Sequence, residues 1–315
     1  MIIQLNNIIK KHNFVKGENN QSKDFVIDLR NKFIKKIKNQ NKKEGALFYS
    51  TSQEKDLNQC TVEEILPHLL VNSSMAAIES KEKIWVAASM LVRFLTSFTN
   101  NLVVMESENP VGMIGSREVL QGLYENPTHD FFSEHHVYEI MNKDLHITSQ
   151  KTRVSDLLKK MSQNGRDFAL VQTTDGEFST ISARRLLEVG IMCNTKIRVS
   201  DVPSKKIVTF QREDTIEHIM MAMLNDNIDI LVLENTPFFV TPQTIFEKID
   251  ELSYLNKIDG FLNHKANTLR MKSGLVISDT TTVPDMCKIM LSMRHTFVMT
   301  QNNVLTPWDL ITTLA

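Results

Sequence analysis

The fold is decided by one stretch of sequence, VSDLLKKMSQNGRDFALVQTTDGEFSTIS, at residues 154–182. Its first half has apolar residues at positions i, i+3, i+4 and i+7, which places Val154, Leu157, Leu158 and Met161 on one face of a helix. Its second half reads as a strand, a turn containing Asp and Gly, and a second strand. Core packing alone explains such a stripe, so it predicts architecture rather than function.

The same order of features occurs four times along the chain. Each copy has a β-rich stretch, a striped helix, a strand, a turn, a second strand and a second helix. The second strands end at equivalent positions that are 59 to 67 residues apart: Gly115, Ser182, Thr241 and Thr306. This regularity predicts an α/β chain of four β-α-β-β-α repeats. The stripes of the other copies are Ile84, Ala87, Ala88 and Leu91; Ile216, Ile219, Met220 and Met223; and Val283, Met286, Cys287 and Met290.

A unit of this size buries too little surface to be stable alone, so the repeats are expected to pair. We expect repeats one and two to form a first module and repeats three and four a second, with a linker at 190–197 and a helical connection within 244–265. The predicted boundaries are 1–58 for an N-terminal basic helical segment and 59–127, 128–192, 193–250 and 251–315 for the four repeats.

Composition excludes several classes of protein. The 315 residues carry a formal net charge of −1, which argues against a surface tuned to nucleic acid. No stretch is apolar enough to cross a membrane, and the start, MIIQLNNIIKKHNF, does not read as a secretory signal. Cys60, Cys193 and Cys287 form neither a disulfide framework nor a metal-binding pattern, so we expect a reduced, cytoplasmic setting.

At this point the sequence resembles the CBS domain, a small regulatory repeat named after cystathionine β-synthase. The resemblance spans about residues 60–315 and is carried by VYEIMNKDLHITSQKTRVSDLLKKM (137–161), IRVSDVPSKKIVTFQREDTIEHIMMAM (197–223) and PVGMIGSREVLQGL (110–123). It implies that paired repeats form a disc-like module with two clefts. Family members often bind an adenine nucleotide or S-adenosylmethionine there and signal to a partner, and they commonly form homodimers.

In this family the binding signature is a Ser or Thr at the end of the second strand, followed three residues later by Asp. The fourth repeat keeps both, as Thr306 and Asp309, with Pro307 at the first helical position. A helix N-terminus attracts phosphate, and a carboxylate can accept the ribose hydroxyls. The alternative is that Thr306 and Asp309 only cap the helix. By the same resemblance, Val276, Ile277 and Ser278 would hold the adenine, and Arg294 and His295 would face phosphate or solvent.

The other repeats depart from the signature. The first has Gly115 and Glu118, with Arg117 between them, and we expect it to be the second binding site. The second and third have Arg185 and Thr244 at the acidic position and are expected to be structural, because an Arg cannot accept a hydrogen bond from a ribose hydroxyl.

Two functions remain open from the sequence. The first is a regulatory, ligand-sensing protein with no required cofactor. The second is a ligand-free scaffold that contacts a protein or nucleic acid through the basic helix predicted in DFVIDLRNKFIKKIKNQNKK (24–43), although that helix is also explained as one packed on the first module. The histidines near residues 129–136 match no zinc pattern, and no nucleotide-binding loop or catalytic motif is present, so we do not expect an enzyme.

Overall fold

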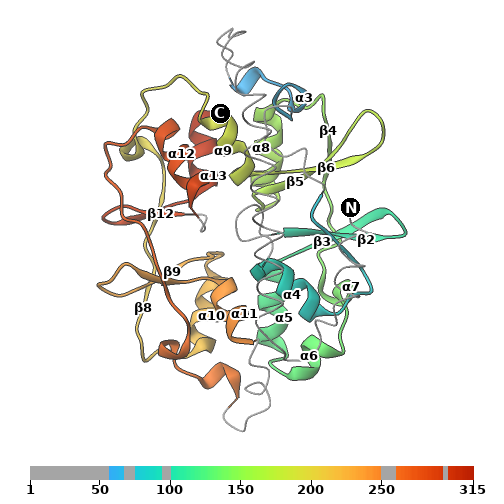
Figure 1. Cartoon of the computed structure of the whole chain (residues 1–315), viewed down its shortest axis with the longest axis vertical. Helices are drawn as coiled ribbons and strands as arrows, with labels where there is room; N and C mark the ends of the chain where they lie inside the picture. The colour runs from blue at the N-terminus through green and yellow to red at the C-terminus, as the bar shows by residue number, and fades with distance from the viewer. Residues whose placement is uncertain (1–56, 67–74, 94–100, 250–259, 294–296) are drawn as a thin grey trace, which may run out of the picture.

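The computed structural model describes residues 57–66, 75–93, 101–249, 260–293 and 297–315. Within these residues, four small sheets are present, and each is built mainly from one copy of the predicted unit (Figure 1). The fold is therefore α/β with tandem repeats, as predicted.

The first two repeats have one topology. The first strand is parallel to the second, and the second is antiparallel to the third. The striped helix makes the crossover that a parallel connection requires. The first repeat consists of β1 (Ala77–Glu79), α4 (Ile84–Arg93), β2 (Asn101–Glu106), β3 (Asn109–Gly115) and α5 (Ser116–Glu125). The second consists of β4 (Ile147–Ser149), α8 (Val154–Gln163), β5 (Phe168–Gln172), β6 (Phe178–Ser182) and α9 (Ala183–Gly190).

The third and fourth repeats keep this order with shorter strands. In the fourth, the first strand is reduced to a parallel bridge between Val276 and Met299. The third consists of β8 (Thr209–Phe210), α10 (Ile216–Asn225), β9 (Leu231–Leu233), β10 (Phe238–Val240) and α11 (Pro242–Ile249). The fourth continues with α12 (Val283–Ser292), β12 (Val298–Met299), β13 (Asn303–Leu305) and α13 (Pro307–Leu314).

The segment that leads into each repeat packs on the other repeat of its module. In the second module, β7 (Lys205–Lys206) pairs with β13, and β11 (Lys272–Ser273) pairs with β10. In the first, the Val62 N–H donates to the Thr152 carbonyl at 2.9 Å and the Tyr138 N–H to the Ser80 carbonyl at 3.0 Å. The sequence boundaries grouped each leading segment with the repeat that follows it. Short helices in these segments are η1 (Leu57–Gln59), α3 (Val62–Ile65), α6 (His129–Ser133), α7 (Val137–Ile140), η3 (Val199–Asp201), η5 (Phe261–Asn263) and η6 (Ala266–Thr268).

Within each module the two sheets pack face to face. A buried cluster joins Val103 and Met113 of the first repeat to Leu170 of the second. A second cluster joins the third and fourth repeats through Phe239 and Phe297, whose rings meet edge to face with centroids 4.5 Å apart. The predicted pairing of repeats one with two, and three with four, is therefore confirmed.

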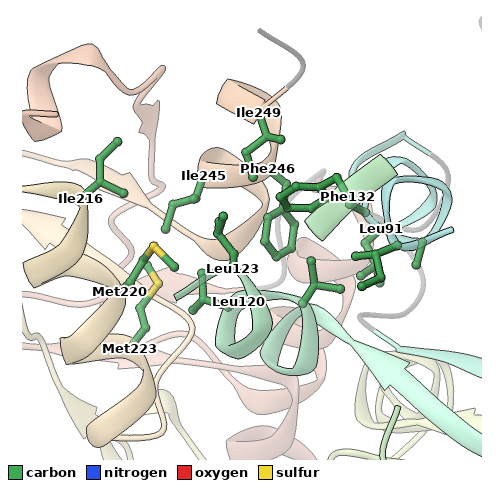
Figure 2. Close-up of a cluster of buried hydrophobic side chains, with 14 of the residues drawn as sticks. Leu91, Leu120, Leu123, Phe132, Ile216, Met220, Met223, Ile245, Phe246 and Ile249 are labelled. Atoms are coloured by element: carbon green, nitrogen blue, oxygen red, sulfur yellow. The ribbon is translucent and has the colours of Figure 1, made fainter. Parts of the chain in front are cut away.

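The helices form the contact between the two modules. One core combines apolar residues of repeats one and three, and a second combines those of repeats two and four. Figure 2 shows the first of these, with Met220 and Met223 of α10 facing Leu120 and Leu123 of α5. All four predicted helix stripes are buried. Each stripe thus closes a core between modules, a role that its periodicity alone could not assign.

Some predictions concern residues outside the described ranges. The basic helix predicted within 24–43 lies there, as do Arg294 and His295. The described part of 244–265 contains the rest of α11 and the 3₁₀ helix η5, which begins after Gly260 at φ +64°.

Candidate functional site

The predicted pair in the fourth repeat meets at the start of α13. Thr306 has extended backbone dihedral angles and directly follows β13, and Pro307 occupies the first helical position. Both the backbone N–H and the hydroxyl of Thr306 donate to Oδ2 of Asp309, at 2.7 and 2.8 Å. The capping role of this pair, which the sequence left as an alternative, is therefore present in the structure. It uses one carboxylate oxygen.

A cation that the sequence analysis did not select lies near this carboxylate. Burial raises the pKa of Asp309, whereas the bonds from Thr306 and the charge of Lys205 lower it, and the net direction is upward. Lys205 reaches the site because β7 pairs with β13, with Lys205 opposite Val304. In the sequence, only the adjacent lysines Lys205 and Lys206 point to this cation. A two-residue strand has no periodic pattern, so the sequence could not predict which strand it pairs with.

The predicted adenine-binding residues lie two strands away from β13. Val276 is 56% exposed, and Leu275 beside it is 41% exposed. Val276 is bridged to β12, and β12 is paired with β13. Because neighbouring strands lie about 4.8 Å apart, Val276 is roughly 10 Å from β13. A nucleoside can span that distance. Ile277 contributes to the core between repeats two and four, and the Ser278 hydroxyl bonds the Thr280 hydroxyl at 2.8 Å. Of the three predicted residues, Val276 presents the clearest apolar contact surface.

The predicted site in the first repeat is already engaged by other parts of the protein. Oε2 of Glu118 accepts the Gly115 N–H at 2.8 Å, and Oε1 accepts Arg166 Nη2 at 2.5 Å. Arg117 donates to the side-chain oxygen of Asn227 in the third repeat. The first repeat thus keeps its carboxylate, but uses it to hold the second repeat. Sequence reasoning missed Arg166 and Asn227, because their contacts cross between repeats.

The second and third repeats use their equivalent residues internally. Ser182 accepts the Arg185 N–H at 3.3 Å, and the Arg185 side chain is buried and donates to the Thr180 carbonyl. Thr244 is fully buried and accepts the Thr241 N–H at 3.1 Å. These contacts fit the structural role expected of both repeats.

Outside the fourth-repeat site, the described chain has a polar hollow and no metal-binding cluster. A polar hollow of about 160 Å³ lies at the β12–β13 turn, the end of the sheet away from Thr306, and is lined by side chains between 199 and 204, by Asp279 and by the turn itself. Among the described residues, no group of three or more His, Cys, Asp or Glu side chains is arranged to hold a metal ion. Nor does any helix in the described ranges have the length and apolarity needed to span a bilayer.

Comparison with solved structures identifies the fold. A protein of Methanocaldococcus jannaschii, described as a proposed archaeal homologue of γ-AMPK, superposes with a TM-score of 0.67 over 79% of this chain and 99% of its own, at 13% identity. Together with the four β-α-β-β-α repeats, this similarity shows which fold the chain has. The chain has the tandem CBS-domain fold.

Other solved structures are similar with lower scores. An uncharacterised conserved protein of Pyrococcus horikoshii has a TM-score of 0.48 and 11% identity, over 77% of this chain and 96% of its own. A CBS-domain protein of Agrobacterium tumefaciens has a TM-score of 0.35 and 14% identity, over 41% of this chain and 97% of its own. No family model and no curated protein matches the sequence.

Proposed function

We propose that this CBS-domain protein is a regulatory chain that binds an adenosine-containing nucleotide in the cleft of its fourth repeat. The observation that carries the proposal is the convergence of three features: the Thr306–Asp309 pair at a helix N-terminus, Lys205 on the strand that pairs with β13, and the exposed aliphatic side chain of Val276 bridged to the same sheet. The similarity to a proposed γ-AMPK homologue supports a regulatory assignment.

Each part of the nucleotide has a matching group at this proposed site. The N–H groups at the start of α13 and the Lys205 ammonium suit phosphate. Asp309 bonds Thr306 through Oδ2, which leaves Oδ1 as the acceptor for a ribose hydroxyl. The apolar surface of Leu275 and Val276 suits the adenine face.

The residues of the proposed site come from two repeats, which gives the ligand a way to act on the protein's conformation. Thr306 and Asp309 belong to the fourth repeat, whereas Lys205 lies in the segment that leads into the third. A ligand that contacts all three favours the arrangement in which β7 stays paired with β13. Signalling to a partner then requires only that this arrangement bind the ligand more tightly than another does.

A thermal-shift screen with AMP, ADP, ATP and S-adenosylmethionine tests the proposal. At about 100 times its dissociation constant, a ligand adds about 2.7 kcal/mol of stability, so one of the four should raise the melting temperature. Asp309→Ala should abolish that shift. No shift with any of the four at millimolar concentration would contradict the proposal and favour a ligand-free scaffold, which deletion of residues 1–55 would then test through loss of partner binding.

The chain offers a matched control for Asp309→Ala. Asp285 occupies the equivalent capping position at the start of α12, where Oδ2 accepts the Thr282 hydroxyl at 2.6 Å. Asp285→Ala should cost a similar capping energy, about 1 kcal/mol, and leave the ligand shift intact. If both variants lose the shift, the effect comes from helix capping rather than from nucleotide contact.

A further inference from the structure

Asn227 of the second module is contacted by side chains from both modules. It follows α10 in the third repeat, and its side-chain oxygen accepts a hydrogen bond from Arg117 Nη1, on the first turn of α5 in the first repeat. Its carbonyl oxygen lies 3.4 Å from Nζ of Lys205, which donates to it from β7. One residue therefore connects the first module to the strand that carries Lys205.

The backbone at Asn227 does not by itself require an asparagine. Asn227 has φ +50°, and the Ile228 N–H donates to the Met223 carbonyl at 3.0 Å, which is the bond that ends a helix in a Schellman motif. The corresponding bond ends α8, where the residue at positive φ is Gly165. Glycine is the usual residue at this position because it has no Cβ. The amide of Asn227 is thus an addition to the turn, and its oxygen is the atom that Arg117 contacts.

The contact between Arg117 and Asn227 lies beside a packed boundary between the modules. The helices α5 and α10 contribute to one apolar core, in which their buried side chains face each other (Figure 2). A second polar bond joins the same two repeats, from Gln243 Nε2 on α11 to the hydroxyl of the buried Ser116 at 3.2 Å. Because this packing fixes both helices, the guanidinium of Arg117 is held at the turn that contains Asn227.

Lys205 belongs to the proposed nucleotide site. It lies opposite Val304 in the pairing of β7 with β13, two residues before Thr306. An ammonium group has three donors, so one bond to Asn227 leaves two for phosphate. A lysine side chain loses much rotamer freedom when it is held in place, and an acceptor that holds the ammonium beforehand lowers that cost when a ligand binds.

We propose that Asn227 is a positioning residue for the ammonium group of Lys205, and that it connects the fourth-repeat site to the first module through Arg117. The inference rests on the proposed function, and it adds the route by which a phosphorylated nucleotide in one module affects the other. Arg117 holds the turn, and the carbonyl of the turn holds Lys205. Because coupling is reciprocal, a phosphate bound to Lys205 also stabilises the contact of Asn227 with Arg117.

The variant Asn227→Gly separates the role of the side chain from that of the backbone. Glycine keeps the positive φ and the carbonyl that faces Lys205, and it removes only the amide that bonds Arg117. The matched control is Asn235→Gly, at φ +57° in the exposed β9–β10 turn. Both variants exchange an exposed Asn for Gly at positive φ, so they change the entropy of the unfolded chain equally.

Isothermal titration with AMP, ADP, ATP and unphosphorylated adenosine tests the inference. Asn227→Gly should weaken the binding of the phosphorylated nucleotides by about threefold to tenfold. It should leave adenosine binding at the wild-type value, because adenosine has no phosphate for Lys205. Arg117→Met should have the same effect, and the double variant should lose no more affinity than either single variant. Asn235→Gly should bind as wild type does.

Wild-type affinity of Asn227→Gly for every phosphorylated nucleotide would overturn the inference. So would an equal loss for nucleotide and adenosine, which a general change of structure would give, or binding of wild type to S-adenosylmethionine alone. In each of these cases the proposed function stands if Asp309→Ala still abolishes binding. If wild type binds none of these compounds, the proposed function fails and the inference fails with it.

Discussion

Arg184 Nη2 lies 2.8 Å from the carbonyl oxygen of Met293, and this hydrogen bond joins α9 of the first module to the end of α12 in the second. Arg184 is only 5% exposed. Burial lowers its pKa to about 10, against the charge of Glu188, so the guanidinium stays protonated at neutral pH. One buried cation thus joins the two modules.

Loss of this guanidinium should weaken the contact between the modules. Hydrogen bonds to charged groups contribute about 1.5–3 kcal/mol, so Arg184→Ala should lower the free energy of unfolding by roughly that amount. Urea denaturation at pH 7 measures it. Arg212→Ala, which removes an exposed guanidinium, should change stability by about 0.5 kcal/mol or less. An Arg184→Ala variant as stable as wild type would show that the contact contributes nothing.

Two neighbouring phenylalanines test the face-to-face packing of the sheets in the second module. Phe239 is 1% exposed and packs on Phe297, whereas Phe238 is 39% exposed on the other face of β10. Phe239→Ala should cost about 3–5 kcal/mol, and Phe238→Ala about 1 kcal/mol or less. Thermal or urea unfolding gives both values. Equal costs for the two variants would be inconsistent with sheets that pack through one face.

The close approach of α9 to α12 makes a prediction about Gly190. A Cβ atom at this position would lie 2.7 Å from Sγ of Cys287 and 3.2 Å from Cδ1 of Leu314. Gly190→Ala should therefore destabilise the protein by about 1–3 kcal/mol through overpacking. Because Cys287→Ala removes the sulfur atom, the double variant should recover part of that loss. Strictly additive costs in this double-mutant cycle would show that the two helices do not meet as described.

Much of the fold could be predicted because its signals are local. The stripe from Val154 to Met161 depends on helical period alone, and the turn at Asp175 and Gly176 depends on turn chemistry, with Gly176 at φ +85°. Both features recur in order, so the repeat count and the pairing of repeats followed. The Thr306–Asp309 pair was found through the resemblance to CBS domains, whose binding signature lies within one helical turn.

The remainder depends on contacts that no local pattern reports. Glu118 retains the acidic character of the signature, yet its second oxygen is occupied by Arg166, 48 residues away. Lys205 reaches the fourth repeat because a leading segment crosses to the other repeat of its module. In each case the charged residue is visible in the sequence, but the residue that it contacts is determined by the tertiary structure.

Isothermal titration of the full chain with the adenosine ligand that gives the largest thermal shift tests the central claim most directly. The structure predicts saturation at one molecule per chain, because the equivalent carboxylate of the first repeat already bonds Arg166, and it predicts that Asp309→Ala removes the binding heat while Asp285→Ala preserves it. Binding that survives Asp309→Ala with unchanged affinity would place the ligand elsewhere and contradict the account.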